Sequence, residues 1–149
     1  MSQQTPSNNI SKKIGSWDIT LLILRIWLGY MMMKNGRYFF QLFYSQEYRN
    51  FFVGWFGKTL HFPFPLLMAY LAKGAEFFGG LLVLSGLYTR VGASLIAFTM
   101  LVATLTANIG KNWDVDGTIT VSFCLFAVIL IYWGAGKYAL NNVLKTKKQ

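Results

Sequence analysis

The sequence predicts an all-α membrane protein, an antiparallel bundle of four transmembrane helices. Its 149 residues are 54% hydrophobic and 17% aromatic, with a mean hydropathy of +0.41, so the chain is far more apolar than an ordinary soluble domain. The apolar residues are also gathered into four stretches, each near or above the ~20 residues that a helix needs to cross a bilayer. Four spans in so short a chain leave no room for a soluble domain.

The expected domain organisation has three parts. A polar N-terminal segment precedes a helical membrane domain, and a basic tail follows it, with bounds of 1–16, 17–141 and 142–149. Within the membrane domain we place the four spans at about 18–44, 65–88, 90–110 and 117–136.

The first span and the loop after it are both unusual. The stretch 18–44 is longer than a bilayer requires, so its helix must tilt, kink near Gly36, or project beyond the membrane. In the following loop one face of a short helix would be apolar, and we expect this helix to lie flat on the membrane. That face is formed by Phe52, Trp55, Phe56 and Leu60.

The remaining spans are expected to pack as antiparallel neighbours. Pro65 suits the first turn of the second helix. The sequence GLYTRVG is a short turn, which places the second and third spans side by side. Because lipid gives helices no hydrophobic reason to associate, small residues should mediate their close approach. The candidates are Gly29, Gly36, Gly79, Gly80 and Gly86.

The net charge of +9 fits a membrane topology and is not read as a nucleic-acid surface. With a cytoplasmic N terminus, most lysine and arginine residues outside the spans lie on the inner side, as the positive-inside rule requires. We therefore expect both termini in the cytoplasm, the inner membrane of a bacterium as the location, and the lipid bilayer as a partner. The inner set is Lys12, Lys13, Arg90, Lys137, Lys145, Lys147 and Lys148, and the outer set is Arg49, Lys58 and Lys111.

Charged residues inside the predicted spans need partners, because each costs several kcal/mol in hydrocarbon. The second span contains Lys73 and Glu76, and the first contains Arg25. If Trp17 and Tyr88 mark the inner boundary, Arg25 lies ~12 Å and Glu76 ~18 Å above it, at 1.5 Å per residue.

Long side chains close a gap of that size, so an Arg25–Glu76 pair is the first prediction. Lys34, ~25 Å above the boundary, is nearly opposite Arg25 around the helix and aligns with Arg37, which suits the outer headgroups. Lys73, one turn before Glu76, either pairs with it along the helix or extends outward. We interpret these buried charged residues either as an ion pair that fixes helix register or as a pocket for a ligand or a proton path.

The sequence offers no resident metal or redox site. His61 and Cys124 are the only histidine and cysteine, so neither a bis-histidine haem nor a dithiol relay is expected. Asp114 and Asp116 follow one another closely in a predicted loop, which we expect to be solvated rather than to bind a cation. Any redox role therefore needs a borrowed cofactor.

The chain resembles the DoxX family of small four-helix membrane proteins over about residues 17 to 141. AEFFGGLLVLSGLYTRVGASLIAFTMLVA (75–103) resembles the central motif of that family, LLILRIWLGYMMMKNG (21–36) its first helix, and WGAGKYALN (133–141) its closing run, here without the usual proline. The family is linked with oxidoreductases, and its relatives include a membrane subunit of thiosulfate:quinone oxidoreductase. The positions that match are Arg25, Gly29, Gly36, Glu76, Gly79, Gly80, Gly86, Thr89 and Arg90.

Three functions are compatible with this pattern. The leading hypothesis is a membrane subunit or accessory protein of a respiratory or redox complex, which holds a quinone among Arg25, Lys34, Lys73 and Glu76, with Glu76 as a candidate proton relay. If catalytic, it would be a quinone-linked oxidoreductase subunit without a redox cofactor of its own. The alternatives are a scaffold or assembly factor without chemistry, and a homo-oligomeric carrier of a small anion or lipid. The expected protein partners are other membrane or redox proteins, further copies of the chain, or both.

Overall fold

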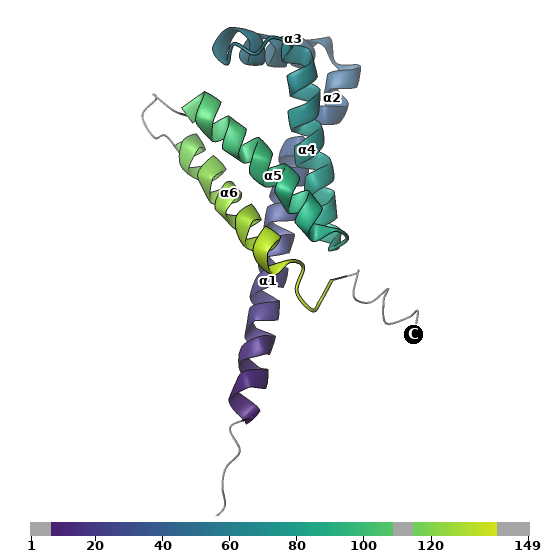
Figure 1. Ribbon diagram of the computed structural model, residues 1–149. Coiled ribbons are helices and arrows are strands. Elements are labelled where there is room, and N and C mark those ends of the chain that lie inside the picture. Colours follow the sequence, from purple (N-terminus) through teal and green to yellow (C-terminus); the bar gives the residue numbers. More distant parts are fainter. Residues whose placement is uncertain (1–6, 109–114, 140–149) are drawn as a thin grey trace, which may run out of the picture.

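The computed structural model shows an all-helical chain (Figure 1). It describes residues 7–108 and 115–139, which form six α-helices, two π-helical turns and no strand. The elements are α1 (Ser7–Gly36), α2 (Tyr38–Tyr44), α3 (Gln46–Gly54), η1 (Trp55–Thr59), α4 (Pro65–Ser85), α5 (Thr89–Ala103), η2 (Thr104–Asn108) and α6 (Val115–Trp133). The predicted all-α class is confirmed.

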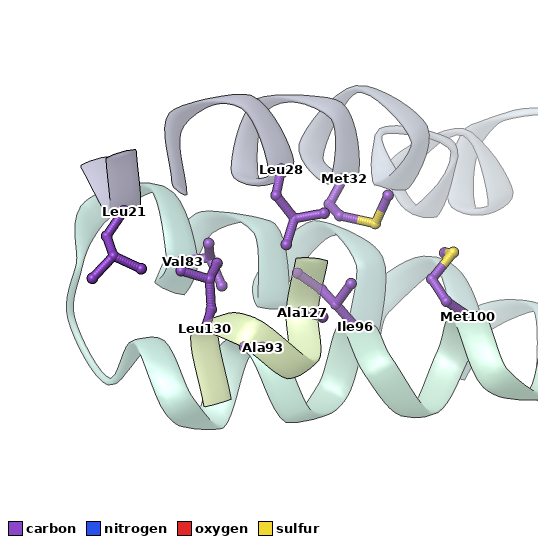
Figure 2. Packing of buried hydrophobic residues seen from close by; sticks show 9 residues of the cluster. All are labelled: Leu21, Leu28, Met32, Val83, Ala93, Ile96, Met100, Ala127 and Leu130. Atoms are coloured by element: carbon purple, nitrogen blue, oxygen red, sulfur yellow. The ribbon is translucent and has the colours of Figure 1, made fainter. Parts of the chain in front are cut away.

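The four long helices pack in chain order. α1 lies against α4, α4 against α5, and α5 against α6, while α6 makes a smaller contact with α1. The N-terminal part of α1 extends beyond the other helices (Figure 1). Side chains from all four helices meet in one apolar core (Figure 2). This core contains Leu21, Leu28, Met32, Val83, Ala93, Ile96, Met100, Ala127 and Leu130.

Glycine lines both interfaces of α4. A Cβ on Gly29 would lie 2.8 Å from the Leu84 Cβ, and a Cβ on Gly80 would lie 2.8 Å from the Gly29 carbonyl oxygen. On the other face, a Cβ on Gly79 would lie 3.0 Å from the carbonyl oxygen of Gly92. Real Cβ atoms essentially never approach other groups to 2.8 Å, and a contact of 3.0 Å is tighter than most, so the predicted role of these glycines in helix packing is confirmed.

The break predicted near Gly36 is present, and it ends the first long helix. α1 stops at Gly36, and α2 begins at Tyr38 after a single turn residue. Of the three alternatives for the long stretch 18–44, the kink near Gly36 is the one that interrupts the helix. At this position α1 meets α4 without a spacer, because a Cβ on Gly36 would overlap the backbone of Phe77.

The loop after α2 folds as helix α3 and the turn η1, which lie across the end of the bundle (Figure 1). The predicted apolar face exists, but it packs inside the protein and is not left free for lipid. Phe52 and Phe56 are buried in a second cluster with Leu42 of α2 and Ala69 of α4. We call this cluster, with the partly buried side chains around it, the aromatic cap. Its partly buried members are Tyr38, Tyr48, Trp55, Leu60, Phe62, Met68, Tyr70 and Ala72.

The connection from α4 to α5 is short, and the two helices are antiparallel neighbours, as predicted. α4 ends where Gly86 takes the left-handed conformation, with φ of 74°, and its N–H donates to the Leu82 and Val83 carbonyls. This is the usual role of glycine after a helix C-terminus. Tyr88 is also left-handed, with φ of 49°, and α5 begins directly after it.

Among the described residues, two helices are long and apolar enough to cross a membrane, judged by length and composition alone. They are Pro65–Ser85 and Thr89–Thr106, and the apolar part of α6, Gly117–Trp133, is shorter. α1 does not meet the criteria. For α1 to cross a membrane, the protein must provide partners or an aqueous position for its charged residues Arg25 and Lys34.

Candidate functional site

Glu76 and Lys73 form a buried ion pair on α4. The Lys73 Nζ lies 2.8 Å from the Glu76 Oε2 and 3.0 Å from its Oε1, so the ammonium donates to both carboxylate oxygens. Glu76 is only 6% exposed, and the two residues lie one helical turn apart. Of the two predictions for Lys73, pairing along the helix is confirmed.

The aromatic cap covers this pair. The Nζ of Lys73 lies 5.7 Å from the ring centroid of Phe52 in α3, a distance at which a cation is attracted to the face of a ring. Beside the pair, Gly74 leaves room for Phe39, whose ring would lie 3.2 Å from a Cβ at that position. The structure thus places one aromatic ring, that of Phe52, beside the ammonium of the pair.

A cavity of about 360 Å³ lies beside the aromatic cap. Phe52 connects it with the ion pair, because this residue lines the cavity and its ring lies beside the Lys73 ammonium, whereas Lys73 and Glu76 themselves do not line it. The other lining residues come from α2 and α3 and are Tyr38, Glu47, Tyr48 and Phe51. The volume lies within the range of known small-molecule pockets.

The predicted Arg25–Glu76 pair is wrong. Arg25 is 2% exposed, and its guanidinium donates to three backbone carbonyls. Its Nη1 lies 2.6 Å from the oxygen of Ala135, its Nε 3.2 Å from that of Val83, and its Nη2 3.5 Å from that of Leu84. Arg25 therefore joins the C-terminal turn of α4 to the segment after α6.

The register of α1 against α4 explains the error. The prediction counted upward from Trp17 and Tyr88 as one common level, but the Arg25 guanidinium lies at the C-terminal end of α4, against Val83, Leu84 and Gly86. Gly36, not Arg25, lies beside Phe77, the neighbour of Glu76. The eleven residues between Arg25 and Gly36 correspond to ~16 Å along the helix, which is too far for a direct contact.

The structure also separates Lys34 from the proposed pocket. Lys34 lies on the exposed side of α1, as the prediction of a headgroup-facing stripe requires, and so does Arg37. Of the four predicted ligand-binding residues, the structure thus brings together Lys73 and Glu76 and leaves out Arg25 and Lys34.

The sequence analysis placed Phe52 on an apolar helix face but did not connect it with the ion pair. A run of aromatic residues does not show which ring meets a charged group, so the contact between Phe52 and Lys73 needed the structure. The carbonyl acceptors of Arg25 gave no sequence signal at all, because every residue has a carbonyl.

Metal ligands do not gather in the part of the chain that the structure describes. No group of three His, Cys, Asp or Glu side chains is close enough to hold an ion there. The side chains of the loop carboxylates Asp114 and Asp116 lie outside the described residues. Cys124 is half-buried, with its Sγ 3.7 Å from the Ala97 carbonyl oxygen, in keeping with a small core residue.

The central motif residues Thr89 and Arg90 lie beyond the C-terminal end of α4, whereas the ion pair lies near the middle of that helix. They line a second cavity, of about 650 Å³, together with residues of the segment after α6. Gly86 lies at the same end, where a Cβ would come 2.5 Å from the Arg25 Nη2.

Comparison with known proteins gives the relationship. The DoxX family model matches residues 20–109. The chain is also 30% identical over 134 residues to a protein of Bacillus subtilis (strain 168) named "Putative oxidoreductase CatD", covering 89% of this chain and 93% of that protein. No solved structure matches. The match of the family model over more than half of the residues, together with the helical architecture, shows that this chain is a membrane protein of the DoxX family.

Proposed function

We propose that the protein is an integral membrane subunit or accessory protein of a redox complex, and that α1, α4, α5 and α6 are its four spans. The family and the oxidoreductase name of the relative support the redox role. The internal bonds of Arg25 support α1 as a span, because this guanidinium is satisfied by protein carbonyls and does not face hydrocarbon unpaired.

The Lys73–Glu76 pair is the single observation that carries a ligand proposal. The ring of Phe52 lies beside the Lys73 ammonium, and the same residue lines a cavity, which supports a ligand here in addition to a role in helix register. We place a quinone headgroup here, with access through the cavity behind Phe52. Aromatic walls suit a flat ring, and a few charged groups at one edge suit its carbonyl oxygens.

The two charged residues have distinct roles in this proposal. The Lys73 ammonium has three N–H donors, and two of them donate to the carboxylate oxygens of Glu76. The third remains for the carbonyl oxygen of the ring. Glu76 is the group that exchanges a proton with a quinol hydroxyl, as a positioned carboxyl can. The quinone supplies the two-electron chemistry, and a partner oxidoreductase supplies or accepts the electrons.

The test is quinone binding to the purified full chain in lipid nanodiscs. We expect a ubiquinone or menaquinone analogue to bind, and Lys73→Gln and Glu76→Gln each to weaken binding about tenfold or more, because each loses a charge-assisted contact. Lys34→Gln and Asp18→Asn are the matched controls, since they remove the same charges outside this site. They should bind as the unchanged protein does.

The alternatives give different results in the same experiment. A scaffold without chemistry would bind no quinone in any variant, while Glu76→Gln would impair folding or the capture of partner proteins. A carrier of a small anion or lipid would bind no quinone either, and would move a labelled anion or lipid across the membrane of a vesicle. Equal quinone binding by Glu76→Gln and by its control would remove Glu76 from the proposal.

A further inference from the structure

The motif residues Thr89 and Arg90 have no role in the quinone site, but they share a cavity of their own. This cavity of about 650 Å³ lies where the C-terminal end of α4, the N-terminal end of α5 and the segment after α6 meet. We propose that it binds a phosphate group, carried either by a phospholipid headgroup or by a small soluble phosphate ester.

The N-terminus of α5 supplies the first part of the site. The opening N–H groups of an α-helix have no acceptors within the helix, and its dipole favours an anion there. In α5 the residue before the helix, Tyr88, gives no side-chain cap. Thr89 is the first residue of the helix and lines the cavity.

The hydroxyl of Thr89 is the second and independent part. Thr89 is 4% exposed, and its Oγ1 is buried without a hydrogen-bond partner. Serine and threonine hydroxyls elsewhere on α5 do not share this state. The Ser94 Oγ donates to the Arg90 carbonyl, and the Thr99 Oγ1 donates to the Leu95 carbonyl. A buried hydroxyl without a partner is unfavourable, and an anionic oxygen in the cavity would accept its proton.

The charged residues around the cavity favour an anion. Arg90 and Lys137 line it and are exposed, and Asp18 of α1 lines it as the one carboxylate among the described lining residues. The Asp18 Oδ1 already accepts the Lys137 backbone N–H at 3.0 Å, which holds the segment after α6 over the cavity. Two cations against one carboxylate leave a net positive cavity, and a guanidinium matches two phosphate oxygens.

The aromatic residues at this end place the cavity where phospholipid phosphates lie. Trp17 and Trp133 stack with their planes only 5° apart, and both are exposed, as are Tyr88, Tyr132 and Tyr138. Exposed tryptophan and tyrosine gather at membrane–water interfaces. Headgroup phosphates therefore lie at the level of this cavity.

Native mass spectrometry of the delipidated full chain in detergent tests the site. The probes are dioleoylphosphatidylglycerol, dioleoylglycerol (the same chains without phosphate), and sn-glycerol 3-phosphate (the phosphate without chains). We expect the phosphate-bearing probe to bind and dioleoylglycerol not to bind. Thr89→Val and Arg90→Gln should each raise its Kd about tenfold, while Thr89→Ser keeps the hydroxyl and keeps the affinity. Asp18→Asn should lower the Kd, because it keeps an acceptor for the Lys137 N–H and removes the negative charge.

Matched variants separate this site from general effects on charge or folding. Thr99→Val removes a hydroxyl from the same helix, and Lys34→Gln removes one positive charge from an exposed site on α1. Both should bind the probes as the unchanged protein does. Binding of phosphatidylglycerol alone identifies a lipid site, and equal binding of glycerol 3-phosphate identifies a site for a soluble phosphate. The proposal is overturned if Thr89→Val and Arg90→Gln bind as tightly as their controls, or if dioleoylglycerol binds as well as the phosphate-bearing lipid.

Discussion

Two buried charged side chains in this protein are stabilised in different ways. Glu76 is paired locally, by a lysine one turn away on its own helix. Arg25 is paired at long range, by carbonyls of Val83, Leu84 and Ala135. The last carbonyls of a helix have no N–H partner within the helix, and they lie at the negative end of its dipole. A buried guanidinium, which has several N–H groups, can donate to more than one of them at once. Arg25 is therefore a structural residue, whereas Glu76 is the residue to which we assign a ligand role in the proposed function.

The structural role of Arg25 makes a prediction about stability. Arg25→Met keeps much of the side-chain volume but removes three side-chain hydrogen bonds to carbonyls, of which only the Val83 carbonyl keeps a second donor, the Gly86 N–H. We expect a loss of about 2–3 kcal/mol in the free energy of unfolding, the range for hydrogen bonds to a charged group. Arg25→Lys should recover only part of this free energy, because lysine lacks the planar, forked guanidinium that contacts all three carbonyls.

Chemical unfolding of the purified protein in detergent measures this loss. Lys34→Met is the control, since it removes the same type of charge from an exposed position on the same helix. If Arg25→Met unfolds at the same denaturant concentration as Lys34→Met, the carbonyl contacts do not stabilise the fold.

Helix α4 is the central element, because it contacts α1 on one face and α5 on the other. Glycines make both contacts close, with Gly80 against α1 and Gly79 against α5. Small residues at such contacts bring backbones together and increase the dispersion attraction, which is the main source of association inside a bilayer. The same close approach occurs at Gly36, the last residue of α1, after which the chain continues into α2 and the aromatic cap.

A pair of glycine substitutions tests this use of close contact. Gly36→Ala puts a methyl group onto the backbone of Phe77, which cannot move aside as a flexible side chain can. We expect a loss of about 1–3 kcal/mol, the usual cost of overpacking. Gly54→Ala is the matched control, because a Cβ there meets nothing within 4 Å, and it should be neutral or slightly stabilising.

Thermal unfolding of the two variants, followed by circular dichroism, gives the comparison. Equal midpoints for Gly36→Ala and Gly54→Ala would mean that α1 and α4 are free to separate without cost. We also expect weaker quinone binding by Gly36→Ala. Glu76 directly precedes Phe77 in the sequence, so a displaced Phe77 backbone would also displace Glu76.

At the scale of the whole molecule, the two ends of the bundle carry different sites. The aromatic cap occupies the end formed by α2, α3 and the first half of α4, and the Lys73–Glu76 pair lies near the middle of α4, next to Phe52 of the cap. The cavity at Thr89 occupies the other end, where Asp18 of α1 accepts the backbone N–H of Lys137 after α6. In the proposed topology these ends lie on opposite sides of the membrane.

Cysteine labelling tests that topology. In a Cys124→Ser background, Lys58→Cys and Lys137→Cys each place one exposed thiol at one end of the molecule. With four spans and cytoplasmic termini, a membrane-impermeant maleimide should label position 58 in intact bacterial spheroplasts and position 137 only after permeabilisation. Labelling of both positions from the same side would rule out four spans.

The sequence alone was enough for much of this architecture. Local chemistry predicts the helical class, the break near Gly36, the short antiparallel turn at Gly86 and the glycine interfaces. The signals are runs of apolar residues, the lengths of those runs, and glycines, which have no side chain. The pairing of Lys73 with Glu76 also lies within one helical turn, so its possibility was visible in the spacing.

Only the tertiary structure decided which of the possible contacts form. The register of α1 against α4 results from many small packing contacts, and it places Arg25 at the end of α4 and Gly36 at the level of Glu76. The acceptors of Arg25 are backbone carbonyls, which every residue has and no sequence pattern distinguishes. In the same way, Thr89 becomes a candidate ligand residue only because folding buries its hydroxyl beside a cavity without giving it a partner.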